Sequence, residues 1–240
     1  MISRLALTEK IGLQNIFKTS SYYRKFYKEN PTYFRPDGLI CFIGSQGSGK
    51  TLSAVNYVYN LLYMYPKSII VTNLKLTDYE IDNERVFEFK ESNDILKYKN
   101  GIDGVIFLID EIHLYFGSQK GNNNLDPAVL QEICQQRKQR VHIVATTQYF
   151  GQLNIALRRH FDSLIYCKPF LRGYLQINSL INKSSLETDD SSGQVLNAKI
   201  IKKFYFFRSP EMFKRYDTLA VIDNKQLKVG VRKEDLNYGS

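Results

Sequence analysis

The sequence predicts an α/β fold in which helices flank a parallel β-sheet. Short apolar runs alternate along the chain with segments of helical periodicity. Strands that alternate with helices pair in parallel, because each helix returns the chain to the edge where the previous strand began. A glycine-rich turn at residues 44–51 joins the first apolar run to the first helical segment, as a tight strand-to-helix connection requires.

Each expected strand is a continuous apolar run, which is typical of strands buried on both faces of a sheet. The runs lie at residues 39–43, 68–73, 86–89, 105–111, 141–148 and 163–167. The run at 86–89 is short enough for an edge strand. The helices between these strands are expected at residues 52–62, 92–98, 127–139 and 153–160. Pro127 suits the first turn of the third helix, where a missing N–H costs nothing.

Beyond Pro169 the pattern no longer alternates between strand and helix. Residues 174–181 and 195–207 predict a β-hairpin around a polar tip, and we expect this hairpin to be appended to the main sheet. A short helix is expected at 209–215.

We divide the 240 residues into an N-terminal segment (1–37), one α/β domain (38–220, with its hairpin at about 173–207) and a C-terminal tail (221–240). The N-terminal segment carries seven Lys and Arg residues against three acidic ones, interleaved with seven aromatic residues. This mixture suits base stacking combined with phosphate contact. It equally suits a helix that packs on the α/β domain or on a neighbouring subunit.

Composition limits the partners and the compartment. The net charge of +9 and the pI of about 9.3 favour a polyanionic partner or an anionic membrane surface, although a solvated basic surface gives the same values. The three cysteines are widely spaced and form no C-x-x-C pair, which indicates reduced thiols of a cytosolic protein. The sequence shows no secretory signal and no apolar run of about 18 residues, so we expect a cytoplasmic protein without a membrane span.

Residues 44–51 match G-x-x-x-x-G-K-[ST], the phosphate-binding P-loop or Walker A motif. Its glycines allow successive backbone N–H groups to point inward, and the helix N-terminus adds to this anion site. We expect Lys50 to reach the β- and γ-phosphates of ATP and the Thr51 hydroxyl to bind Mg²⁺. The expected nucleotide-binding residues are Gly44, Ser45, Gln46, Gly47, Ser48, Gly49, Lys50 and Thr51.

A P-loop requires a metal-holding acid on a nearby strand. Asp110 ends the apolar run at 105–111, so its carboxylate is expected near the phosphates as a second Mg²⁺ ligand, the Walker B acid. Glu111 follows directly and suits a general base that activates the attacking water. Gln148 closes the next strand, where it could sense the γ-phosphate.

Phosphoryl transfer also needs positive charge at the γ-phosphate, which a neighbouring subunit often donates as an arginine. Arg137 and Arg140 end the helix before the strand at 141–148, and Arg158 and Arg159 follow that strand. We favour Arg158 and Arg159 as the catalytic pair.

This series of motifs resembles the FtsK–HerA branch of P-loop ATPases, which has a RecA-like fold. The resemblance rests on the P-loop, on Ile-Asp-Glu-Ile-His at 109–113, on Ala-Thr-Thr-Gln at 145–148 and on Leu-Arg-Arg at 157–159. Within that branch the chain looks most like zonula occludens toxin-like proteins, among them phage assembly ATPases, and like viral genome-packaging ATPases. The resemblance covers about residues 38–220 and implies the roles given above for Lys50, Thr51, Asp110, Glu111 and Gln148.

The resemblance implies a ring, a hexamer or a pentamer, that moves DNA in the host cytoplasm or in association with the virion. Filamentous-phage assembly proteins typically continue into a membrane span, which this sequence lacks, so packaging is the favoured function. The alternative is an assembly ATPase that exports virions and binds capsid or membrane-embedded virion proteins. A third hypothesis is a structural protein that binds ATP without turnover. A small-molecule kinase also uses a P-loop, but that function would not explain Asp110-Glu111 or the basic N-terminal segment.

Overall fold

The computed structural model of the chain describes residues 13–77, 83–117, 125–188 and 195–217. The chain forms two compact units, Met1–Tyr33 and Phe34–Ser240, and each is considered by itself. Residues 1–12 of the expected N-terminal segment and the expected tail at 221–240 lie outside the described residues.

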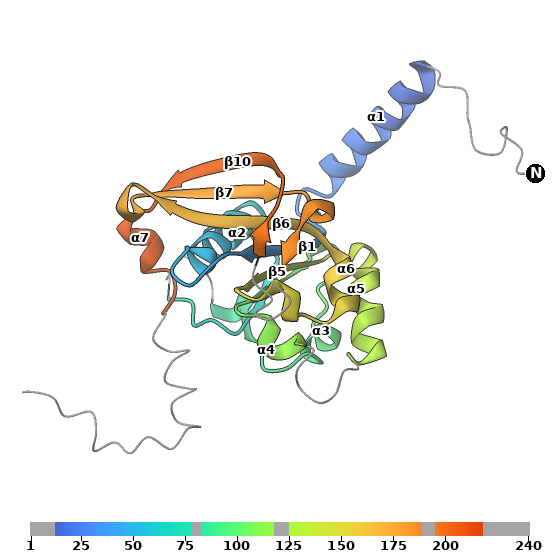
Figure 1. Ribbon diagram of the computed structural model, residues 1–240. Helices are drawn as coiled ribbons and strands as arrows, with labels where there is room; N and C mark the ends of the chain where they lie inside the picture. The colour runs from blue at the N-terminus through green and yellow to red at the C-terminus, as the bar shows by residue number, and fades with distance from the viewer. Residues whose placement is uncertain (1–12, 78–82, 118–124, 189–194, 218–240) are drawn as a thin grey trace, which may run out of the picture. The chain divides into compact units, whose positions relative to one another are not determined.

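The larger unit is built on an eight-stranded sheet with the strand order β10-β7-β6-β1-β5-β4-β2-β3 (Figure 1). Six neighbouring strands, from β6 to β3, run parallel, and β7 and β10 are added antiparallel at one edge. The strands are β1 (Gly38–Ile43), β2 (Ile69–Thr72), β3 (Val86–Glu88), β4 (Val105–Ile109), β5 (Val141–Thr147), β6 (Phe161–Phe170), β7 (Leu175–Ile181) and β10 (Ile200–Phe207). The predicted parallel α/β sheet with an appended hairpin is therefore confirmed.

Helices cover both faces of this sheet. They are α2 (Lys50–Met64), α3 (Asp94–Lys97), α4 (His113–Phe116), α5 (Pro127–Gln139), α6 (Ile155–His160) and α7 (Pro210–Phe213). Short 3-10 turns lie at Asn83–Arg85, Gly101–Asp103, Phe150–Gln152, Leu171–Gly173 and Lys183–Ser185. Figure 1 shows α5 and α6 together, with β1 and β5 between them and α2.

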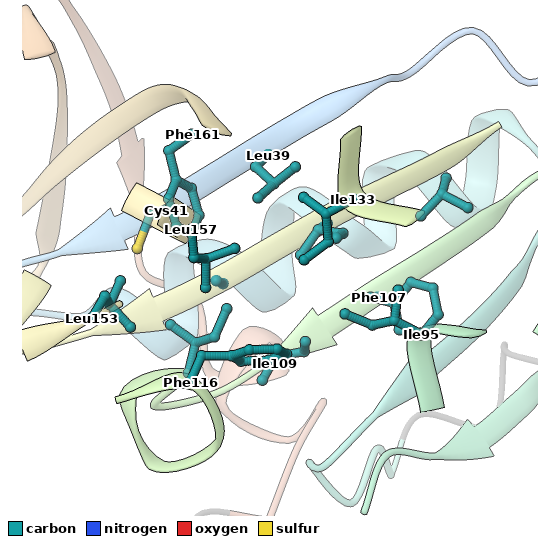
Figure 2. Packing of buried hydrophobic residues seen from close by; sticks show 14 of the residues in the cluster. Leu39, Cys41, Ile95, Phe107, Ile109, Phe116, Ile133, Leu153, Leu157 and Phe161 are labelled. Carbon is teal, nitrogen blue, oxygen red and sulfur yellow. The ribbon is translucent and has the colours of Figure 1, made fainter. Parts of the chain in front are cut away.

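Two hydrophobic clusters form the core, one on each face. Along β1, Leu39 and Cys41 point into the cluster that includes α5 and α6, whereas Phe42 points into the cluster around α2. Figure 2 shows the first cluster, in which Leu157 and Ile133 lie over the sheet beside Leu39. Because both faces are covered, the inner strands are apolar along their whole length, which explains the continuous runs in the sequence.

The strand expected at 195–207 is divided in the structure. Its first part, β9 (Val195–Asn197), pairs with β8 (Glu187–Thr188) in a separate two-stranded sheet, and β10 begins only at Ile200. The backbone at Lys199 is diverted from strand geometry, because its N–H donates to Ser185 Oγ at 2.8 Å and its carbonyl accepts from Asn182 N at 2.8 Å. Apolar patterning does not reveal such a side-chain contact.

In the smaller unit, the described residues 13–33 contain one helix, α1 (Leu13–Glu29). Aromatic rings four residues apart stack along it, with ring centroids 6.4 Å apart for Tyr22 and Phe26 and 6.1 Å apart for Tyr23 and Tyr27. Pairs at this spacing lie on one face of a helix and stabilise it. The helical form of the segment leaves both hypotheses about its partner open.

Gly104 tests the packing at the start of β4. It has a φ of 77°, and a Cβ there would overlap the ring of Phe34, which is fully buried. We expect Gly104→Ala to lower the free energy of unfolding by about 3 kcal/mol, because it adds both steric overlap and backbone strain.

The matched control is Gly101→Ala, where φ is 54° but no atom lies within 4 Å of the added Cβ. Strain alone predicts a loss of about 1 kcal/mol there. Urea unfolding measures both values, and equal losses in the two variants would contradict this account of the packing.

Candidate nucleotide-hydrolysis site

The P-loop runs from the end of β1 to the start of α2, as the motif requires. Gly49 has a φ of 85° and forms the N-cap of α2, and a Cβ on it would collide with the side chains of Gln176 and Arg208. Gly47 has a φ of 73°, and no atom lies within 4 Å of the position of its missing Cβ. Glycine is thus required at 49 by close packing and at 47 by backbone conformation.

Lys50 is buried, with 5% of its surface exposed, and its ammonium donates to the carbonyl of Ser45 at 3.1 Å. The lysine therefore folds back across its own loop. The hydroxyl of Ser48 is also buried and has no hydrogen-bond partner among the described residues. A buried cation beside an unsatisfied hydroxyl suits a polyphosphate, whose oxygens would accept from both groups.

Asp110 joins the P-loop to the neighbouring strands. Its Oδ1 accepts hydrogen bonds from Thr51 Oγ1 at 2.8 Å and from Thr146 Oγ1 at 2.7 Å. The Asn73 side chain fastens the Asp110 backbone, since it donates to the carbonyl at 2.9 Å and accepts from the N–H at 2.8 Å. Burial raises the pKa of Asp110, although the two threonine hydroxyls oppose this shift.

The pair of Thr51 and Asp110 fits a magnesium ion. A hydroxyl oxygen and a carboxylate oxygen are the ligands that Mg²⁺ prefers, and their contact brings both to one point beside Lys50. Among the described residues no cluster of three or more His, Cys, Asp or Glu side chains could hold a metal by itself. A magnesium ion here would complete its coordination with water and nucleotide phosphates, as Mg²⁺ usually does.

Glu111 is held from two directions. Gln148 donates to the carboxylate through its Nε2 at 3.0 Å and through its backbone N–H at 3.3 Å, and His113 Nδ1 lies 3.2 Å from Glu111 Oε2. Burial alone would raise the pKa of Glu111, but the hydrogen bonds from His113 and Gln148 and the charge of Lys50 outweigh it, so the pKa is lowered. The carboxylate is thus ionised and available as a proton acceptor.

The backbone at Glu111 is strained, with a φ of 49° in a residue that is not glycine. Its N–H donates to Thr146 Oγ1 at 2.9 Å, so one threonine contacts both acidic residues. Strained backbone of this kind concentrates at functional sites.

The structure brings Gln148 to Glu111, but it does not bring the favoured arginines to the P-loop. Arg158 and Arg159 lie on α6 beside a cavity of about 310 Å³ that Phe150 and Lys183 also line. No hydrogen bond or ion pair among the described residues connects either arginine to the P-loop, Asp110 or Glu111. Arg158 Nε is buried and has no partner among the described residues.

Sequence reasoning missed four residues that support the site. His113 lies only two positions after Glu111, so its proximity was visible in the sequence. Gln176 is fully buried in β7 and donates to the Ser48 carbonyl at 3.1 Å, while Arg208 Nε donates to Gln176 Oε1 at 3.0 Å. Asn178 accepts from Ser53 Oγ in α2 at 3.0 Å. Polar residues at alternate positions of an apolar strand were the signal that could have revealed Gln176 and Asn178.

Fold and site together define a P-loop NTPase, in which the loop follows β1 while Asp110 and Glu111 follow β4, with β5 between these two strands. The chain belongs to the AAA family, the ATPases associated with various cellular activities, whose family model matches residues 40–169. The P-loop ATPase predicted from the motifs is therefore confirmed. No helix among the described residues has the length and apolar character needed to cross a membrane.

Several solved structures resemble the chain at low identity. The N-terminal domain of zonular occludens toxin from Neisseria meningitidis has a TM-score of 0.48 and 17% identity, over 75% of this chain and 100% of that domain. The genome-packaging NTPase B204 of Sulfolobus turreted icosahedral virus 2 has a TM-score of 0.46 and 14% identity, over 70% of this chain and 98% of that one. The DNA-packaging ATPase B204 of Sulfolobus turreted icosahedral virus has a TM-score of 0.44 and 16% identity, over 70% of this chain and 99% of that one. No curated protein matches the sequence.

The contacts of Glu111 predict a measurable shift in its ionisation. Its lowered pKa stabilises the folded protein at pH values above the ordinary glutamate pKa, and this contribution is lost as the pH falls through the folded-state pKa. We expect His113→Ala to raise the pKa of Glu111, because it removes one of the hydrogen bonds that favour the carboxylate.

A ¹³C NMR titration of the Glu111 carboxyl, assigned by comparison with Glu111→Gln, measures this pKa. The control is His160→Ala, because His160 lies at the end of α6 and contacts Cys134, with Nε2 3.5 Å from Sγ. An unchanged pKa in His113→Ala would show that His113 does not set the ionisation of Glu111.

Proposed function

We propose that this ATPase is a DNA-translocating motor that works as a ring of identical subunits, a hexamer or a pentamer, in viral genome packaging. The observation that supports hydrolysis best is the meeting of Thr51, Asp110 and Thr146 at one carboxylate oxygen, directly before an ionised Glu111. A protein that only bound ATP would not need a glutamate held in this way. We place the protein in the host cytoplasm or in association with the virion.

In the proposed reaction, the P-loop N–H groups and Lys50 hold the β- and γ-phosphates of ATP. Lys50 exchanges its contact with the Ser45 carbonyl for phosphate oxygens. Thr51 and Asp110 are the residues that would hold Mg²⁺. When bound, this ion neutralises charge that develops on the phosphates.

Glu111 accepts a proton from the water that attacks the γ-phosphate. Oε2 contacts the Gln148 N–H and His113, whereas Oε1 accepts one hydrogen bond, from Gln148 Nε2, and keeps a lone pair for the water. Gln148 directly follows β5, the strand between β1 and β4, and it is therefore suited to exchange its contact with Glu111 for one with the γ-phosphate when ATP binds. Such an exchange would couple nucleotide binding to activation of the base.

The positions of the arginines support the proposal of a ring. Arg158 and Arg159 lie on α6 and have no hydrogen bond or ion pair to their own P-loop among the described residues, so they suit a role at the nucleotide of the adjacent subunit. An arginine donated in this way also couples hydrolysis to movement between subunits.

DNA is the proposed cargo because the chain is basic. The net charge is +9, and the segment at 1–37 combines cations with aromatic rings, which bind phosphates and stack on bases. The alternative partners, capsid or membrane-embedded virion proteins, would bind instead through the same segment or through the apolar hairpin.

Substitution of the two central residues separates binding from hydrolysis. Lys50→Ala should abolish ATP binding and turnover, because it removes the phosphate cation. Glu111→Gln should still bind ATP but hydrolyse it more slowly by a factor of about 100 or more, because an amide cannot accept the proton.

Phosphate release and nucleotide binding measure both effects, with the surface variant Lys202→Ala as the control. Normal turnover in Glu111→Gln would refute the assignment of the base. Undetectable hydrolysis by the wild-type chain in every assembly state would favour the hypothesis of a protein that binds ATP without turnover.

Mixing two inactive variants tests the arginine in trans. If each site uses its own Glu111 and the neighbour's Arg159, a mixture of Glu111→Gln and Arg159→Ala subunits contains some sites with both groups intact. Equal amounts should recover about a quarter of wild-type turnover in randomly mixed rings.

Each variant alone serves as the control. If neither Arg158→Ala nor Arg159→Ala is recovered on mixing, although mixed rings form, the arginines act within their own subunit or not at all.

A further inference from the structure

A second cavity lies next to the P-loop and has no part in the phosphate and metal contacts described above. It has a volume of about 620 Å³, and the residues lining it include Arg172, Tyr174, Arg208, Pro210, Phe213 and Lys214. Its walls come from the turn between β6 and β7 and from the start of α7, which lie at the same end of the hairpin in Figure 1. The volume falls within the range of small-molecule sites.

Arg208 connects this cavity to the P-loop. Its Nη2 lies 3.5 Å from the Ser48 carbonyl, and it also contacts the side chain of Gln176, which holds the same carbonyl. Its Nη1 lies 3.6 Å from the position that a Cβ on Gly173 would take, at the wall of the cavity. One guanidinium therefore spans the distance from the phosphate loop to the cavity. A group attached to phosphates on the loop would reach the cavity directly.

The lining suits a flat aromatic ligand. Tyr174 is 71% exposed and Phe213 is 52% exposed, so both rings present faces that the fold does not use. Arg172 and Arg208 add planar cations, which stack on aromatic faces, and Lys214 adds another positive charge. We propose that this cavity receives the base and ribose of the nucleotide whose phosphates bind the P-loop, an inference that rests on the proposed function.

One wall of the cavity is bonded to α2, the helix that begins at the P-loop. Arg215, just beyond α7, donates to Asn56 Oδ1 at 3.0 Å and lies over the ring of Tyr59, 4.8 Å from its centroid. The hydroxyl of Tyr59 in turn donates to the Arg215 carbonyl at 3.0 Å. Both partners belong to α2, so the wall formed by α7 keeps its place relative to Lys50.

The opposite wall is a strained turn. Leu171 and Arg172 have φ values of 49° and 54°, and Gly173 has a φ of 93°. Two successive residues other than glycine in the left-handed region are costly, and such strain is typical of ligand clamps. The turn directs Arg172 and Tyr174 to the cavity at that cost.

The side chains that line the cavity suit contacts with the faces of a base rather than with its edges. Among the described residues that line it, none is acidic and none carries an amide side chain. A guanine-specific site would need such a group to read the edge of the base, whereas stacking accepts every base. The chain should therefore bind adenine and guanine nucleotides with affinities within about threefold of each other.

Calorimetry with ADP, GDP and inorganic pyrophosphate tests this assignment on the full chain. Wild type should bind ADP and GDP similarly, and both more tightly than pyrophosphate. Tyr174→Ala and Phe213→Ala should each weaken ADP binding about tenfold, the usual effect of losing one stacking ring, without changing pyrophosphate binding. Tyr174→Phe keeps the ring and should bind ADP normally.

Two controls separate this inference from the proposed function. Tyr63→Ala removes an aromatic ring of α2 that is 90% exposed and does not line the cavity, so it should change neither ligand. Lys50→Ala should weaken ADP and pyrophosphate alike.

If wild type binds pyrophosphate and ADP but Tyr174→Ala and Phe213→Ala leave the ratio of their affinities unchanged, the base does not lie in this cavity. If wild type binds neither ligand, the proposed phosphate site at the P-loop is refuted, and the proposed base site is refuted with it. A guanine or adenine preference above about tenfold would refute recognition by stacking alone.

Discussion

The site depends on one contact, the hydrogen bond from Thr51 Oγ1 to Asp110 Oδ1. It joins the first turn of α2, the helix that follows β1, to Asp110 directly after β4, and β5 separates β1 from β4 in the sheet. Thr146, from β5, donates to the same oxygen at 2.7 Å. Three elements therefore converge on one carboxylate, whose pKa burial raises. A buried carboxylate of this kind gains most from a cation, which is why the site suits Mg²⁺.

The same convergence controls the neighbouring glutamate. Thr146 Oγ1 also accepts the backbone N–H of Glu111, which keeps that residue in a strained conformation with its side chain toward Gln148 and His113. Asp110 and Glu111 thus share one support at the end of β5. A movement at the end of β5 would change the positions of Asp110 and Glu111 together. The nucleotide bound at the site could in this way be coupled to a movement of the protein.

The appended hairpin contributes to the nucleotide site as well as to the sheet. Gln176 holds the Ser48 carbonyl, and Arg208 holds Gln176, so the P-loop rests on residues that follow it by more than a hundred positions. The strands and the P-loop were predictable because burial on both faces and phosphate binding each leave a local pattern in the sequence. The position of Asp110 and Glu111 near the P-loop was predictable because parallel strands end at the same edge. Gln176 left a signal as a polar residue in an apolar strand, but its partner in the P-loop left none. The contact of Arg208 was not predictable, because a long-range side-chain contact leaves no periodic pattern, and neither was the break of the ladder at Lys199.

The central claim, that ATP hydrolysis at this site drives movement on DNA, is tested most directly by the rate of phosphate release with and without DNA at two salt concentrations. A basic motor should hydrolyse ATP several-fold faster with DNA at low salt, lose this stimulation as salt displaces DNA, and lose about 100-fold or more of its turnover in Glu111→Gln. The contrary result is turnover that depends on Glu111 but ignores DNA under all salt conditions. If such turnover responded to anionic liposomes instead, the cargo would lie at a membrane and the alternative of an assembly ATPase would hold.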